Sequence, residues 1–442
     1  MGRQIAFRDR IAVSLGARVP MIVLVLPAAI AGVWAMSASR VDHARSENAG
    51  SAERDAQIAA WSNALAADSL SAIALGQLGA LHLQKARETG DQSGYVRAEG
   101  YARKSISLRK TRNGSSFVTL GAALVARHEF AAADSVISEL VSREPDIPQY
   151  LALLGEIKLE RGDYDAARIA FSSVHGVRTH LSVAPRLSRW MELTGNSRGA
   201  RDLLHQALAE VKLRPDLPRE QAAWFYLRAG DLDMQHGRLR GARKTFEAGL
   251  ERNPGDHRLL SAMSRLEAAD GNPRMAILFG ERAVAIRPDL LTLGALGNAY
   301  AVAGDTAMSS QYFKALEATV SASGAAHDRA SSLMLLDRNS RVREVLAVAR
   351  TDLLSRHDIY GYDILAWALH KSGRNIEARE AMAHALRLGT DDATLSYHAG
   401  VIERALGNDA RARLHFERAL AINPRFDKRP QSVRAMLDSL KS

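Results

Sequence analysis

The chain has 442 residues, a formal net charge of +10 and no cysteine, and it is 47% hydrophobic but only 6% aromatic. The absence of cysteine excludes disulfides, thiol catalysis and thiolate metal sites. The length exceeds what one hydrophobic core usually supports, a limit that stacked repeats avoid. A composition rich in Ala, Leu and Arg with few aromatics is typical of helices that pack closely over small residues.

The chain begins with a basic tail, residues 1–18, followed by an uncharged and mostly apolar segment, residues 19–37. A helix from Val19 to Met36 would be about 27 Å long, close to the ~30 Å hydrocarbon thickness of a bilayer. The tail carries an excess of arginine, which predicts that it stays in the cytoplasm. These arginines are Arg3, Arg8, Arg10 and Arg18, against Asp9 alone. We predict a single inner-membrane helix or uncleaved signal anchor with the rest of the chain in the periplasm; a cleaved signal peptide and a soluble buried helix are the alternatives.

Residues 38–55 are polar and are predicted to form a juxtamembrane linker, and helical periodicity runs from residue 56 to residue 426. Within that range one motif recurs: a Gly followed by Asp, Asn or Arg, with a small residue five positions later. It appears at Gly162, Gly195, Gly237, Gly271, Gly304, Gly373 and Gly407. Its period near 34 residues indicates helix pairs stacked into a solenoid. Two further copies lack the glycine and are predicted to turn at His128 and Arg338.

Other positions keep the same register. A small residue lies seven positions before each turn, and Phe often lies nine positions after it. We expect the small residue to let the two helices of a repeat approach closely, and the aromatic ring to fill the gap to the next repeat. The turn glycine supplies a left-handed backbone conformation. Residues 427–442 repeat Val and Leu at helical spacing, which predicts a capping helix that shields the last repeat from water.

Two stretches carry a family resemblance. The segment Leu296-Gly297-Asn298-Ala299-Tyr300, followed by Gly304-Asp305, resembles the L-G-x-x-Y and G-D pattern of the tetratricopeptide repeat (TPR) family. The stretch from Leu154-Gly155 to Gly162-Asp163-Tyr164 is similar. The resemblance covers about residues 68–426. It implies an all-α fold, a TPR-type α-solenoid of about ten helix-turn-helix repeats, here preceded by a single N-terminal transmembrane helix.

The sequence contains no phosphate loop, H-E-x-x-H, nucleophile elbow or G-x-G-x-x-G motif. His175 and His180 could bracket a metal in a loop, but no third ligand accompanies them. We therefore expect no enzyme activity, no cofactor and no metal site.

In the TPR family the first helix of each repeat lines a concave groove, which implies a partner-binding wall here. Counting three before, one after and four after the small residue, together with Tyr360, gives the candidate groove residues. They are Arg189, Glu192, Asp231, Arg265, Asn298, Asp328, Tyr360, Asp363, Trp367, His370, Tyr397 and Arg404. The aromatic and acidic segment 358–367 is predicted to be a contact hot spot, so that Asp363→Ala should weaken partner capture but leave thermal melting nearly unchanged. Ordinary packing of Trp367 between repeats is the alternative.

We interpret the chain as a membrane-anchored, non-catalytic scaffold that binds a protein or peptide of the bacterial cell envelope in its concave groove. One alternative is an accessory subunit of envelope polysaccharide assembly or export. Another is an RNA-binding helical repeat protein. The positive charge is modest once spread along the chain and no basic-aromatic stripe appears, so no nucleic-acid partner is expected.

Overall fold

The computed structural model describes residues 37–174, 176–323, 329–425 and 430–440, and these residues form helices and connecting turns without any strand. The chain divides into two units, residues 1–56 and 57–442. The described part of the first unit is the beginning of helix α1 (Ser37–Ala67). The stretch predicted as a linker, residues 38–55, is therefore helical. Its Ala, Arg and Glu residues are strong helix formers.

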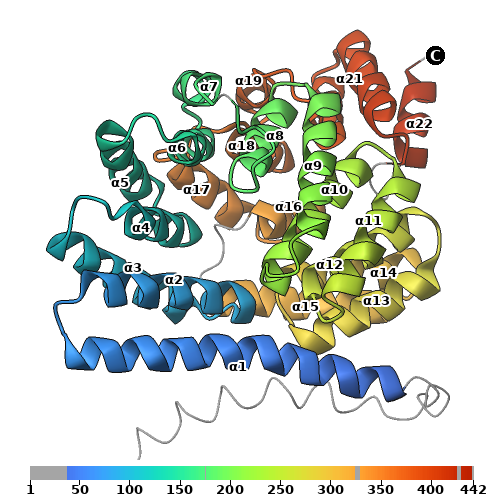
Figure 1. Ribbon diagram of the computed structural model, residues 1–442. Helices are drawn as coiled ribbons and strands as arrows, with labels where there is room; N and C mark the ends of the chain where they lie inside the picture. The colour runs from blue at the N-terminus through green and yellow to red at the C-terminus, as the bar shows by residue number, and fades with distance from the viewer. Residues whose placement is uncertain (1–36, 175, 324–328, 426–429, 441–442) are drawn as a thin grey trace, which may run out of the picture. The chain divides into compact units, whose positions relative to one another are not determined.

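The second unit consists of helical hairpins, each with a first and a second helix (Figure 1). The ten hairpins in the described residues are α2 (Ala72–Thr89) and α3 (Gln92–Leu108), α4 (Gly114–Ala126) and α5 (Phe130–Arg143), α6 (Pro148–Arg161) and α7 (Tyr164–Ser172), α8 (Ala184–Leu193) and α9 (Ser197–Lys212), α10 (Arg219–Gln235) and α11 (Leu239–Arg252), α12 (His257–Ala269) and α13 (Pro273–Ile286), α14 (Leu290–Val302) and α15 (Thr306–Ser323), α16 (Arg329–Asp337) and α17 (Val342–Asp352), α18 (Ile359–Lys371) and α19 (Asn375–Ala385), and α20 (Ala393–Ala405) and α21 (Asp409–Ile422). Helix α22 (Pro430–Ser439) follows and packs on α21, with Val433 fully buried. The predicted all-α solenoid is confirmed.

The turn between the two helices of a hairpin has a left-handed residue, as the sequence predicted. All seven motif glycines have φ between 70° and 84°, a conformation that costs glycine nothing. His128 takes this role without glycine, at φ 61°. The prediction for Arg338 is one residue off, because Asn339 is the left-handed residue there, at φ 53°. Asparagine tolerates this conformation better than most side chains, since its short polar group can hydrogen-bond locally.

The small residue before each turn allows a phenylalanine ring to lie directly on the first helix. A Cβ added to Gly230 would stand 2.2 Å from Cε1 of Phe246, and one added to Gly400 would stand 2.6 Å from the ring of Phe416. Gly155 and Gly297 meet Phe171 and Phe313 in the same way. In each case the ring packs against the glycine of its own hairpin. The expectation that the ring mainly fills the gap to the next repeat is therefore corrected: it closes the hairpin itself.

Successive turns of the superhelix touch along a seam within the second unit. We define the seam as the contacts of the hairpin turns near residues 160–164, 193–197 and 234–237 with the loops 356–359, 387–391 and 423–425. Most of its hydrogen bonds join residues 189 to 197 positions apart in the sequence, and the one from the Arg387 guanidinium to the Gly162 carbonyl joins residues 225 apart. The backbone N–H of His357 donates to the Arg161 carbonyl at 2.7 Å, and the Thr390 hydroxyl donates to the Leu193 carbonyl at 2.6 Å. Figure 1 shows α6, α7 and α8 beside α18 and α19.

The predicted membrane segment, residues 19–37, lies outside the described residues except for Ser37. Among the helices that are described, none is both long enough and apolar enough to cross a bilayer. The groove candidate Asp328 and the loop residue His175 also lie outside the described part of the chain.

Candidate partner-binding surfaces

The first helices of neighbouring hairpins are joined by a ladder of polar contacts, in which an acidic residue on one helix meets a donor on the next. The rungs are Glu156–Arg186 (2.7 Å), Glu192–Arg228 (2.9 Å), Asp231–Arg265 (2.9 Å), Asp337–Trp367 (3.1 Å) and Asp363–His398 (2.8 Å). Each rung joins residues 30 to 36 positions apart, which is about one repeat. Among the described residues the ladder therefore joins first helices at five junctions: α6–α8, α8–α10, α10–α12, α16–α18 and α18–α20.

Five of the candidate groove residues are members of this ladder, so the structure pairs them within the chain. They are Glu192, Asp231, Arg265, Asp363 and Trp367. Asp363 and Trp367 are each 2% exposed. The expectation that Asp363 could be removed without affecting stability is therefore corrected, because its carboxylate forms a buried ion pair with His398. Helical spacing placed these residues on the correct helix, but on the side that contacts the next first helix.

The hot-spot segment is an aromatic and histidine cluster. The Trp367 ring stacks on His398 with centroids 4.1 Å apart and on His370 at 5.0 Å. Tyr397 is buried beside the Trp367 ring at 6.2 Å. His370 is half-buried and its Nδ1 bonds the Asn375 side chain at 2.8 Å. These contacts match the alternative reading, in which Trp367 packs between repeats.

Two other candidates, Arg189 and Tyr360, meet across superhelical turns. The Arg189 guanidinium of α8 lies over the Tyr360 ring of α18 at 5.1 Å and forms an ion pair with Glu192 at 2.7 Å. Burial alone would raise the pKa of Glu192, but Arg189 and Arg228 outweigh it and lower that pKa to about 2. Burial raises the pKa of the Tyr360 hydroxyl. Between α8 and α18, the chain's own side chains therefore occupy the predicted groove.

The remaining candidates are more accessible. Asn298 is half-buried on α14, and Arg404 is exposed on α20, where it donates to the Ser439 hydroxyl of α22 at 3.1 Å. His180, the other residue of the possible metal loop, shares a hydrogen bond with Ser182 at 2.8 Å. No group of three or more His, Asp or Glu side chains within the described ranges is placed to hold a metal ion.

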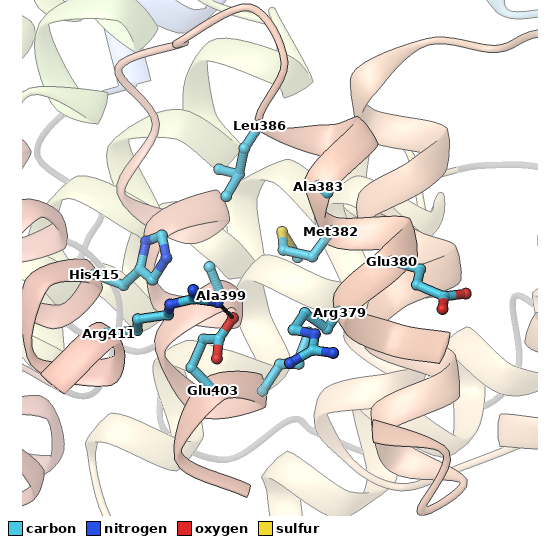
Figure 2. Close-up of a pocket in the computed structure, with 10 residues that line it drawn as sticks. Arg379, Glu380, Met382, Ala383, Leu386, Ala399, Glu403, Arg411 and His415 are labelled. Carbon is cyan, nitrogen blue, oxygen red and sulfur yellow. Dashed lines mark ion pairs between the residues drawn. The ribbon is translucent and has the colours of Figure 1, made fainter. Parts of the chain in front are cut away.

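A hollow that the sequence did not indicate lies between α19, α20 and α21 (Figure 2). Its volume is about 350 Å³, and we call it the C-terminal hollow. The lining residues are Arg379, Glu380, Met382, Ala383, Leu386, Ala399, Ile402, Glu403, Arg411 and His415. The i, i+3 and i+7 spacing of Arg379, Met382 and Leu386 could have marked one helix face. That pattern does not predict that a hollow forms between α19 and α21.

Charged groups stand around the apolar floor of the hollow. Glu403 is 7% exposed and accepts a hydrogen bond from the Asn408 side chain at 2.6 Å, with Arg411 4.0 Å away. Burial lowers the pKa of His415 below its usual value, so its imidazole is neutral at pH 7. The hollow therefore combines apolar surface with arginine and imidazole donors at its rim.

Comparison with known proteins agrees with the hairpin architecture. A tetratricopeptide repeat family model matches residues 118–174, 227–290 and 365–425. No curated protein matches the sequence significantly. Among solved structures, the chain is similar to the APC/C hetero-tetramer Cut9–Hcn1, at 13% identity over 90% of this chain and 95% of that chain, with a TM-score of 0.34. It is also similar to a tetratricopeptide repeat protein from Parabacteroides merdae, at 16% identity over 59% of this chain and 99% of that chain, with a TM-score of 0.34. A third similar structure is the human IFIT1 dimer with PPP-AAAA, at 14% identity over 79% of this chain and 82% of that chain, with a TM-score of 0.43. The chain therefore contains tetratricopeptide repeats in the three matched regions, where the hairpins lie in the predicted register.

Proposed function

We propose that this TPR protein is a non-catalytic scaffold that binds a protein partner in the bacterial cell envelope. The observation that carries the proposal is the continuous array of hairpins, which forms an extended surface. Repeat arrays of this kind commonly act as binding surfaces. The buried pairs Glu192–Arg228 and Asp363–His398 support the same reading, because each joins the first helices of neighbouring repeats.

We further propose that residues 19–36 anchor the scaffold in the inner membrane, with the hairpins on the periplasmic side. Support for this comes from the sequence: the segment is uncharged, it has the length of a bilayer span, and arginines precede it. A tether at the amino end would hold the hairpin array close to the membrane surface.

Membrane extraction tests the anchor. The full-length chain should remain in the membrane pellet after alkaline carbonate treatment, and protease added outside the cytoplasmic membrane should digest the hairpins. The matched control is the full-length double variant Leu24→Arg and Leu26→Arg, because each charge at the centre of a span costs about 2.5–3.5 kcal/mol. This variant should be released by carbonate. Release of both proteins to the same extent would refute the anchor.

Reciprocal capture tests the scaffold. The tagged chain, isolated from detergent-solubilised membranes, should retain one envelope protein at a fixed ratio, and that protein, tagged in turn, should retain this chain. Recovery of a glycosyltransferase or a porin would favour the polysaccharide alternative, and enrichment of RNA would favour the RNA-binding alternative. If the chain elutes alone in both directions, the scaffold proposal fails.

A further inference from the structure

We infer that the C-terminal hollow binds a peptide segment in which a large apolar side chain lies next to Asp or Glu. The inference rests on the proposed role as a protein-binding scaffold and specifies the chemistry of one binding surface. The hollow lies apart from the ladder residues on which the groove prediction was based, and its donors are not occupied by the contacts that hold the repeats together.

The apolar half of the recognition comes from the floor and the rim. Met382 and Ile402 are buried beneath the hollow, and Leu386 is half-buried at its wall. The volume of about 350 Å³ is at the small end of ligand pockets, so it suits one large side chain. Ile376 on α19 and Leu414 on α21 are 62% and 66% exposed. Each lies three residues from a lining arginine and extends the apolar surface outward, which is typical of interaction sites.

The charged half comes from the arginines. Arg379 and Arg411 formally balance Glu380 and Glu403, but the geometry does not leave these charges equivalent. Glu403 is buried and already bonded to Asn408. Glu380 is exposed and points away from the hollow in Figure 2. The space over the floor is therefore dominated by positive charge.

The two arginines are also available to a ligand. Arg411 is 67% exposed, and its guanidinium lies 4.0 Å from the Glu403 carboxylate, which is the outer limit of an ion pair. Figure 2 shows Arg379 directed over the floor, with no ion pair to the other residues drawn there. An incoming carboxylate would gain charge-assisted hydrogen bonds from guanidinium groups, whereas a lysine would be repelled. The neutral imidazole of His415 adds one further donor or acceptor.

Peptide selection on the full-length protein in detergent tests this inference. Random twelve-residue peptides displayed on phage should yield sequences with Asp or Glu beside a large apolar residue. One synthetic peptide from that set is then measured against three variants. Ala383→Trp fills the hollow from an exposed position, and Arg379→Glu reverses the charge. The matched control, Arg350→Glu, reverses an exposed arginine on α17 outside the hollow.

We expect at least tenfold weaker binding for Ala383→Trp and for Arg379→Glu, and no change for Arg350→Glu. Thermal melting verifies that each variant is folded. Unchanged binding to Ala383→Trp, or equal losses for the two arginine reversals, would overturn the inference. If no peptide is enriched while reciprocal capture still yields an envelope protein, the hollow is excluded and the scaffold stands. If peptides bind the hollow but capture fails in both directions, the scaffold proposal fails independently.

Discussion

Asp363 and His398 form an ion pair that is almost fully buried, with side chains 2% and 3% exposed. Removing one member of such a pair leaves a buried charge without compensation, which typically costs about 3–5 kcal/mol. We therefore expect Asp363→Ala to lower the free energy of unfolding by that amount, as measured by urea denaturation. A urea denaturation curve equal to that of the unaltered chain would show that Asp363 is a free contact residue.

The same pair predicts a dependence of stability on pH. Burial alone would lower the pKa of His398, but the Asp363 carboxylate outweighs it and raises that pKa above 6.5. Because the folded-state pKa is the higher one, His398 stabilises the fold fully below about pH 6.5, and this contribution is lost as pH rises through the folded-state value. In Asp363→Asn the urea midpoint should change less above pH 6.5 than in the unaltered chain. Parallel curves would show that this pair does not titrate.

Glu192 predicts the opposite dependence. Its pKa is about 2 in the folded chain and 4.5 as an ordinary glutamate, so its contribution is present above pH 4.5 and is lost as pH falls through 2. We expect Glu192→Gln to cost about 1.5–3 kcal/mol at pH 6, because Arg189 and Arg228 lose a charged acceptor. The difference from the unaltered chain should shrink at pH 3 in urea titrations. A constant difference would mean that the carboxylate charge is not what holds the two arginines.

The sequence placed these residues on the correct helices but misjudged their surroundings. Counting from a small residue gives the face of a helix, and it correctly put Asp363 and Trp367 one turn apart. Whether that face is open depends on how closely the next first helix approaches. His398, the partner of Asp363, is 35 residues away, and no local sequence pattern predicts that the two residues pair. Arg189 and Tyr360 meet across a superhelical turn, which is further still from any local signal.

At the scale of one hairpin, the contact of glycine with phenylalanine carries a prediction. Gly230→Ala would place Cβ 2.2 Å from the Phe246 ring, and overpacking of this kind costs about 1–3 kcal/mol. The matched control is Gly100→Ala in α3, where nothing lies within 4 Å of the added Cβ. Because alanine favours a helix interior over glycine by roughly 0.5–1 kcal/mol, this control should be neutral or stabilising. Thermal melting distinguishes the two variants.

A second substitution identifies the cause. Adding Phe246→Leu to Gly230→Ala removes the part of the ring nearest the new Cβ, so the double variant should be more stable than the sum of the two single changes implies. Strict additivity would mean that the ring and the glycine are not in contact.

Elements were predictable where a local rule dictates them. The turn glycines and the small residues before them are tied to backbone conformation and close helix approach, so the register of the hairpins could be read directly. The rule fails where another residue takes the place of the glycine, as at Asn339, or where strong helix formers occur in a polar stretch, as in the first part of α1. The C-terminal hollow is a third such case, because it arises from the separation of α19 and α21 and not from a motif.

For the whole second unit, the deciding feature is the seam, which we expect to set the pitch of the superhelix. It joins loops to hairpin turns nearly 200 residues away, and no sequence motif on either side predicts the contact. Gly162 shows how tight this contact is, since a Cβ added there would stand 2.4 Å from the His357 carbonyl carbon. Gly304 has the same backbone conformation, with φ of 82° against 84° for Gly162, but nothing lies within 4 Å of its added Cβ.

These two glycines separate the seam from the turn. Alanine at either position pays about 1–2 kcal/mol for left-handed backbone, so Gly304→Ala should lower stability by that amount and leave the radius of gyration unchanged. Gly162→Ala carries the same cost and also forces the seam apart, which adds about 1–3 kcal/mol of overpacking. Small-angle X-ray scattering should then show a larger radius of gyration, because separated superhelical turns lengthen the solenoid. Equal scattering curves for the two variants would show that the seam does not set the pitch.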